Sequence, residues 1–497
     1  MFNLIDEKWI PVICKSGTIR KIAPWEITDN RDPPIKVCFS RPDFNSAVTQ
    51  FLIGLVQTSS TPKDVDEWLD MLENPPSCEA LKEKMSFFKD AFELIGGNHP
   101  FMQEPGVENR KSIDRILITS PGDNTVKLNK DFFIKRNDGR NCLCMSCAAA
   151  SVYTLQALAP VGGSGIRCSM RGSSPLTTMV EGINLATTIF LNILIKDNLG
   201  SGTDGHIFPW MSDEKCEVFS SVDNDPRMVY WTVVRRIALG SLKEGTCMLC
   251  GSTGPSIVDY DEVSKGSSYS GWEHPLCPYS KDKTDTKPVK VSEGIGHLNE
   301  WTYMMYTGLS EVCPSKAVRQ VQMNRLDIKE ICFGQEIRLW INGYVNDKAS
   351  VKAWKEIHQP MLMDYDERAK SAMTLAIADM IRLAEYGCDQ LKKALKILYG
   401  PRDRSNIGRP VSIPSDLIES YWNGCDSIFE KFVSRIGPED NDKLLLQWGS
   451  ELHSVASSAL DGAADSVPLE YYSNVALSRK NLSMHMSEKS ISKELNK

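Results

Sequence analysis

The chain has 497 residues, more than one compact core normally holds, and this length predicts two or three domains. Its formal net charge is −7, which argues against an avid, stand-alone nucleic-acid binder, because neutralising phosphates needs clustered Lys and Arg. The charge does not exclude a subunit that carries a few local basic loops.

Hydropathy and the first residues indicate where the protein works. No uninterrupted apolar run reaches the roughly 18 residues of a membrane-spanning helix, and the nearest candidate, residues 185–195, predicts a buried helix. Acidic residues occupy the N-terminal positions where a signal peptide needs basic ones, so we expect no export, no membrane association and a cytoplasmic location. The 15 cysteines are then better suited to metal binding than to disulfides.

The N-terminal third shows regular patterns. Residues 9–12 and 18–22 flank a Lys-Ser-Gly turn and predict a β-hairpin. Apolar residues at helical spacing predict a helix over 45–58, and further helices over 65–72 and 78–94.

The middle of the chain, about 100–350, is irregular. It is rich in Gly, Ser, Pro and Cys, and it mixes short strand-like runs with loops. The polar stretches 252–270 and 280–287 predict flexible loops.

The C-terminal part is helical. Residues 366–398 carry apolar side chains at helical spacing and end at Gly400-Pro401. Three further helical stretches follow, at 414–436, 440–461 and 469–494. Four helices with short connections predict a four-helix bundle, and the alternative is one larger α-helical domain.

These patterns give an α+β fold class with two domains. We expect a mixed α/β N-terminal domain over residues 1–355, with irregular loops and a zinc-stapled region. Residues 356–497 then form the four-helix bundle.

Cysteine spacing is the strongest chemical signal. Cys144-Met-Ser-Cys147, the first knuckle, and Cys247-Met-Leu-Cys250, the second knuckle, are both C-x-x-C motifs. A two-residue gap lets the backbone turn around one ion, and four thiolates form the usual tetrahedral structural zinc site. The knuckles lie far apart in the sequence, so this zinc would staple distant segments together.

Other ligand sets remain open. The second knuckle also has His274 and Cys277 downstream, in the stretch His-Pro-Leu-Cys, and Cys142 could replace Cys144. The cysteines could also be buried or solvent-facing thiols without a metal.

A glycine-rich loop follows the first knuckle. Residues 160–165 read Pro-Val-Gly-Gly-Ser-Gly, and Arg167 and Arg171 come next. Glycines let a backbone approach a phosphate, sugar or groove floor, while arginines supply charge. No Gly-Lys-Ser/Thr follows, so this is no Walker loop, and a plain connection is the alternative.

A basic stretch precedes the first knuckle. Phe133 and Ile134 are surrounded by cations, and a loop that mixes cations with an aromatic ring suits nucleic acid. A solvated surface loop explains the pattern equally well. The cations are Lys127, Lys130, Lys135, Arg136 and Arg140.

Catalytic motifs are missing from the sequence. We find no H-E-x-x-H, G-x-S-x-G or S-x-x-K in a convincing context, and the 7 histidines are scattered. His99 is better explained as a packed loop residue than as a base. The sequence therefore predicts a protein that is not an enzyme, with a zinc-containing hydrolase or nuclease as the alternative.

Several strings in collinear order resemble the large subunit (CasA family) of the type I-E CRISPR surveillance complex Cascade. They span nearly the whole chain and include the two knuckles and the glycine-rich loop. The other strings are residues 3–12, 99–103, 170–178, 272–279 and 343–350.

The resemblance implies a fold and a function. The fold is a mixed α/β N-terminal domain followed by a C-terminal four-helix bundle. The implied partners are the other Cascade protein subunits, the CRISPR RNA, double-stranded target DNA and a recruited nuclease-helicase. The subunit reads the protospacer-adjacent motif, promotes strand separation and recruits the nuclease-helicase in antiviral defence. A scaffold subunit without DNA contact is a further alternative.

The resemblance also implies DNA-binding residues. The family's lysine finger falls near Lys265, and a loop that touches the motif region falls on Phe133, Ile134 and Lys135. Lys348 stands where the strand-splitting wedge usually has glutamine, and a lysine cannot imitate the donor and acceptor edge of an amide. The glycine loop falls on Val161, Gly162, Gly163, Ser164 and Gly165, and the wedge on Asn346, Asp347, Lys348 and Ala349.

Overall fold

Two compact units make up the computed structural model. The first comprises Met1–Val291 and Pro314–His358, and the second comprises Ser292–Cys313 and Gln359–Lys497. The structure describes residues 1–120, 141–162, 165–200, 202, 205–212, 216–281, 286–291, 312–347, 350–361, 363, 367–400, 412–433, 435–437 and 441–496.

Helix α1 (Pro42–Ser59) forms the centre of the first unit and confirms the helix predicted over 45–58. Proline in its first turn starts the helix, and its apolar residues lie on all sides, so nearly every side chain is buried. It packs against α5 (Met145–Leu158) and α6 (Leu185–Asn192). Around Phe51, edge-to-face aromatic contacts with centroids 5.4–5.9 Å apart fill the core.

The predicted hairpin is present near the N-terminus. Strand β2 (Ile10–Cys14) pairs antiparallel with β3 (Ile19–Ile22) and, on its other side, with β4 (Pro34–Val37). A separate pair joins β1 (Phe2–Asn3) to β5 (Glu93–Ile95).

One helix prediction in this region is too long. Helix α2 (Val65–Glu73) agrees with the sequence, but α3 (Cys78–Ser86) stops before the predicted end at residue 94. The 3-10 helix η2 (Lys89–Phe92) and strand β5 take the remaining residues. Leu94 is fully buried in this strand, so pairing with β1 overrides the helical spacing.

Short sheets fill the middle of the first unit. Strand β12 (Thr253–Ile257) lies between β11 (Leu242–Thr246) and β7 (Leu143–Cys144). The other strands are β13 (Asp259–Val263), which lies between β10 (Arg236–Leu239) and β6 (Arg110–Ser112), and the parallel pair β9 (Val218–Ser220) and β14 (Ser268–Ser270).

The loop predicted over residues 252–270 is therefore wrong, because three strands occupy it. Within 280–287, parts of β15 (Tyr279–Lys281) and β16 (Thr286–Pro288) pair antiparallel. Polar strands of this kind form because pairing with a neighbouring strand satisfies their backbone groups.

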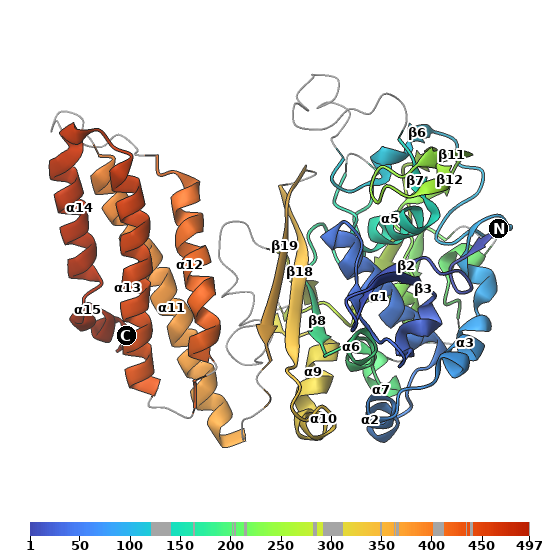
Figure 1. Ribbon diagram of the computed structural model, residues 1–497, viewed down its shortest axis with the longest axis horizontal. Helices are drawn as coiled ribbons and strands as arrows, with labels where there is room; N and C mark the ends of the chain where they lie inside the picture. Colours follow the sequence, from blue (N-terminus) through green and yellow to red (C-terminus); the bar gives the residue numbers. More distant parts are fainter. Residues whose placement is uncertain are drawn as a thin grey trace. The chain divides into compact units, whose positions relative to one another are not determined.

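A three-stranded sheet follows along the chain. Strand β18 (Arg338–Asp347) lies between β8 (Thr177–Glu181) and β19 (Ser350–Pro360), as Figure 1 shows. The other elements described before β18 are η1 (Pro24–Thr28), η3 (Ile113–Ile116), α7 (Lys196–Leu199), η4 (Pro209–Met211), η5 (Pro226–Tyr230), β17 (Val312–Cys313), α9 (Lys316–Met323) and α10 (Arg325–Ile331).

The second unit is a helical bundle, which confirms the α+β fold class (Figure 1). Helix α13 contacts α11, α12 and α14, and Trp448 of α13 is fully buried, with its indole N–H 2.8 Å from the Met380 carbonyl. The helices are α11 (Glu367–Leu398), α12 (Ser415–Val433), α13 (Asn441–Asp465), η7 (Leu469–Tyr471), α14 (Tyr472–His485) and α15 (Glu488–Leu495).

The last predicted helix, 469–494, is divided in the structure between η7, α14 and α15. In the part of the chain that the structure describes, no helix has the length and apolarity needed to cross a membrane.

Candidate metal centre and nucleic-acid interface

The two cysteine knuckles meet where β7, α5 and the β11–β12 hairpin join. Cys144 ends β7 and caps α5, and Cys147 lies in the first turn of that helix. Cys247 and Cys250 lie in the turn between β11 and β12, where Gly251 adopts φ +74°. Pairing of Ser256 on β12 with Cys144 brings the knuckles together.

The four Sγ atoms fit a tetrahedral zinc ion. All lie within 4.8 Å of one another, and those of Cys144 and Cys250 are 3.6 Å apart. Zn–S bonds of about 2.3 Å in a tetrahedron place the sulfurs roughly 3.8 Å apart. The sulfurs of Cys144, Cys147, Cys247 and Cys250 thus form the cluster that the spacing predicts.

The alternative ligand set is not assembled. Nδ1 of buried His274 accepts a hydrogen bond from the Leu276 amide at 3.1 Å, and the Cys277 thiol lies 3.4 Å from the Pro278 carbonyl. The Cys142 thiol donates to the Thr246 carbonyl at 3.1 Å instead of joining the cluster. Cys142 still supports the site, because its carbonyl accepts from the amide of Met248 at 3.0 Å.

The thiols of the cluster affect one another's ionisation. Hydrogen bonds from Cys147 and Cys247 lower the pKa of the Cys144 thiol, and the bond to Cys144 raises the pKa of Cys147. One thiolate in the cluster therefore disfavours a second. A divalent cation reverses this effect, because it attracts every thiolate.

The glycine loop begins just beyond α5 and is tied to several segments. The Ala159 carbonyl accepts from the Ser169 amide at 2.9 Å, and the Pro160 carbonyl accepts from the Arg235 guanidinium at 2.9 Å. The exposed Val161 donates its amide to the Ser173 hydroxyl at 3.0 Å. Gly163 and Ser164 lie outside the described residues.

Lys265 lies beside the far end of this loop. Its amide donates to the Gly165 carbonyl at 2.7 Å, and its backbone has φ +66°, which is uncommon for a residue other than glycine. The next residue must be glycine, because a Cβ on Gly266 would lie 1.9 Å from the Val234 carbonyl oxygen. Lys265 itself is exposed.

Asn346, near the end of β18, contacts Ser173, the residue that also bonds Val161. Its side-chain amide donates to the Ser173 carbonyl. Asp347 is the last residue of β18. Lys348 and Ala349 lie outside the described residues, as do Phe133, Ile134 and Lys135.

Arg171 has a different role from the one predicted. Its side chain is 2% exposed and therefore cannot supply charge to a phosphate. The guanidinium bonds the Thr177 hydroxyl, the Gln50 side-chain carbonyl and the Ala157 carbonyl at 2.9–3.2 Å, and burial lowers its pKa. It fixes the segment that follows the glycine loop, while Arg167 is exposed.

Sequence reasoning missed Ser173 and Arg235. Besides Pro160, Arg235 contacts Glu262 of β13 at 3.3 Å, so one buried guanidinium joins the glycine loop to the strand before Lys265. A lone serine and a lone arginine carry no motif, and their partners lie far away in the sequence. His99 is packed as expected, with Nδ1 3.1 Å from the Trp210 carbonyl.

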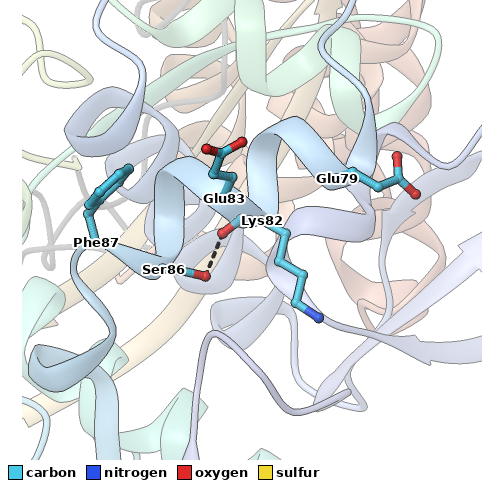
Figure 2. Close-up of a pocket in the computed structure, with 5 residues that line it drawn as sticks. All are labelled: Glu79, Lys82, Glu83, Ser86 and Phe87. Atoms are coloured by element: carbon cyan, nitrogen blue, oxygen red, sulfur yellow. Dashed lines mark hydrogen bonds between the residues drawn. The ribbon is translucent and has the colours of Figure 1, made fainter.

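Figure 2 shows a hollow elsewhere, on the surface of α3 and the residue after it. Phe87 at its edge is 81% exposed, and the Ser86 hydroxyl donates to the Lys82 carbonyl at 2.6 Å. The hollow contains none of the predicted site residues. Its lining is Glu79, Lys82, Glu83, Ser86 and Phe87.

Comparisons with known proteins show a family and a fold that this chain shares. The family model of the CRISPR-associated protein Cse1 matches residues 3–459. The CasA crystal structure from Thermus thermophilus is 17% identical with a TM-score of 0.76, over 98% of this chain and 99% of that one.

Two further solved structures share the fold. Cse1 from Acidimicrobium ferrooxidans is 14% identical with a TM-score of 0.73, over 100% of this chain and 98% of that one. A chain of a CRISPR RNA-guided surveillance complex is 14% identical with a TM-score of 0.69, over 97% and 99%.

Proposed function

Because the chain belongs to the Cse1 (CasA) family of CRISPR-associated proteins, we propose that it is the large subunit of a CRISPR RNA-guided surveillance complex. In this role it recognises the protospacer-adjacent motif in duplex DNA and promotes strand separation. It then recruits the nuclease-helicase that cuts the target. Its partners are the other protein subunits, the CRISPR RNA and the target DNA.

The observation that carries the proposal is the convergence of three DNA-reading elements that are distant in the sequence. Gly165 bonds Lys265 through the backbone, while Val161 and Asn346 both bond Ser173. A scaffold without DNA contact gives no reason for these particular segments to meet. A subunit that reads DNA needs these elements close together, so that all of them can contact the same short stretch of duplex.

The exposed groups suit the minor groove. A glycine-rich backbone has few side chains that clash with the groove floor, and Lys265 offers donors to the acceptors that bases present there. Because the minor-groove pattern is degenerate, we expect loose motif specificity. We assign DNA contact to residues 161–165, 265, 346–348 and 133–135.

We further propose that the cysteine cluster holds one structural zinc ion. Cys144, Cys147, Cys247 and Cys250 would be its ligands. Bound zinc supplies a rigid cross-link between thiolates and performs no reaction when its shell is filled by protein. The link would fix the start of α5, the helix that leads into the glycine loop.

The test compares variants in the assembled complex by gel-shift titration on motif-bearing and motif-lacking duplexes. Gly163→Asp puts a side chain and a negative charge beside phosphates, and Lys265→Ala removes a base contact. Each substitution should reduce the affinity of the complex for motif-bearing DNA by one to two orders of magnitude, since a good groove contact provides about 1–3 kcal/mol. The affinity for motif-lacking DNA should fall less.

The matched control is Lys243→Ala, which removes an exposed cation from β11. It should leave the preference for motif-bearing DNA unchanged. If Gly163→Asp and Lys265→Ala both bind motif-bearing DNA like the wild type, the reader assignment is wrong and the scaffold role replaces it.

A further inference from the structure

Ser173 makes two hydrogen bonds to two different DNA-reading elements. Its hydroxyl accepts from the Val161 amide, at the start of the glycine loop, at 3.0 Å. Its carbonyl accepts from the Asn346 side chain, at the end of β18. In the part of the chain that the structure describes, Ser173 therefore links the glycine loop to β18, the strand that leads into the wedge.

Further hydrogen bonds anchor the segment around Ser173. Ser169 and Gly172 form a turn with two mutual hydrogen bonds of 2.9 Å, and the Ser169 amide bonds the Ala159 carbonyl. Arg171 fixes the same segment from the core through three acceptors. Ser173 therefore follows an anchored turn, and a shift of its own peptide would move both of its partners.

We propose that Ser173 is a positioning residue that couples motif reading by the glycine loop to strand separation by the wedge. This inference rests on the proposed function. When the loop is seated in the groove, the Val161 bond holds Ser173 in place. The Ser173 carbonyl in turn sets the direction in which Asn346 and the end of β18 present the wedge.

Variants can break the two bonds separately. Ser173→Ala removes the hydroxyl but keeps the carbonyl, so only the bond to Val161 is lost. Asn346→Ala removes the other bond. Ser173→Thr keeps a hydroxyl at a half-buried position and serves as the rescue. The control is Ser86→Ala, another serine whose hydroxyl bonds a main-chain group, on α3.

The assay measures binding of the assembled complex to a fully paired motif-bearing duplex and to one mismatched at its first base pairs. One lost hydrogen bond should weaken capture of the paired duplex by about 3- to 10-fold for Ser173→Ala. The mismatched duplex needs no opening and should be captured nearly normally. Ser173→Thr should restore binding, and Ser86→Ala should behave as wild type.

Coupling predicts that the two losses are not additive. Adding Asn346→Ala to Ser173→Ala should weaken capture by less than the product of the single effects. A purely structural role for Ser173 predicts equal weakening on both duplexes, and this result would overturn the proposal. The proposal would also be overturned if Ser173→Ala captured the paired duplex like the wild type. It would fail too if the effects of the two substitutions multiplied in the double variant.

The outcomes separate this inference from the proposed function. If Lys265→Ala weakens motif-bearing DNA while Ser173→Ala does not, the chain reads DNA and only the coupling fails. If neither variant changes DNA binding, the proposed function fails as well. Metal content and thermal melting of each variant establish that the first unit is folded.

Discussion

His358 contacts charged and aromatic side chains from all three strands of its sheet. Its Nδ1 lies 2.7 Å from a carboxylate oxygen of Glu181 on β8, and its Nε2 lies 3.4 Å from Glu356 on β19. Its ring stacks on Trp340 of β18, and Arg338 donates to its carbonyl at 2.9 Å. Burial acts to lower the pKa of His358, but hydrogen bonds and charge from the two glutamates outweigh it and raise the pKa to about 9.

This arrangement predicts a pH dependence of stability. The folded pKa of His358 lies above the unfolded value of about 6.5. The ion pairs therefore stabilise the fold fully below pH about 6.5, and this stabilisation is lost as the pH rises through about 9. The melting temperature of the wild type should exceed that of His358→Gln at pH 6, and the difference should shrink by pH 10.

The residue-level measurement is an NMR titration of the His358 ring. We expect its midpoint near pH 9 in the wild type and a lower midpoint in Glu181→Gln, which removes one negative partner. A midpoint at the ordinary histidine value in the wild type would contradict the ion-pair arrangement.

At the scale of elements, the cysteine cluster joins segments that already pair. Strand β7 bonds β12, and the second knuckle forms the turn of the β11–β12 hairpin. Loss of a metal should therefore loosen this hairpin and the start of α5, while the core around α1 remains folded. Structural zinc contributes on the order of 10 kcal/mol to the folding of small modules. In this chain a large hydrophobic core also stabilises the fold, so the effect of metal loss should stay local.

The prediction is one zinc per chain in protein purified without added zinc. A strong chelator should then increase amide exchange over residues 242–257 and 143–147 but not within α1. Cys250→Ser, which removes one exposed ligand, should show the same local increase. Well-folded protein with zinc near zero would contradict the site.

Elements could be predicted where the local pattern and the tertiary environment agree. The amphipathic α11 and the N-terminal hairpin follow from spacing alone. Helix α5 was missed because its small and apolar residues surround it and leave no polar face. The strands β12, β13 and β14 were missed because their polar residues gain order from distant partners.

The residues of the candidate site also fall into those that could be predicted from the sequence and those that could not. The clustering of the four cysteines could be predicted, because C-x-x-C spacing reflects the local geometry of metal binding. The roles of Ser173 and Arg235 could not, since each depends on contacts with residues far away in the sequence. Arg171 was misread because its neighbours in sequence suggested a surface loop, whereas its partners are buried.

At the scale of the whole molecule, the net charge and the buried arginines have separate effects. The net charge of −7 leaves little general attraction for DNA. Arg171 and Arg235 are buried and bonded internally, so they hold the glycine loop and the segment after it and are not available to phosphates. Under the proposed function, DNA affinity would therefore come from a few exposed groups and from the partner subunits.

The same reasoning predicts that the isolated chain does not cut nucleic acid. Among the described residues, the cysteine cluster offers four thiolates to the proposed zinc ion, and these would fill a tetrahedral shell and leave no position for a water nucleophile. His358, with a pKa of about 9, is protonated at neutral pH and cannot act as a base there. Purified chain incubated with plasmid DNA or RNA and Mg²⁺ or Mn²⁺ should give no cleavage above the buffer control.

The matching experiment adds the assembled complex and the recruited nuclease-helicase, and motif-bearing DNA should then be cut. Column fractions must be assayed across the protein peak, because a contaminating nuclease elutes independently of the chain. Nicking that follows the peak through a second purification would contradict the prediction. If Cys250→Ser also abolished that nicking, the cysteine cluster would be a reactive centre, and the non-catalytic role of the chain would have to be abandoned.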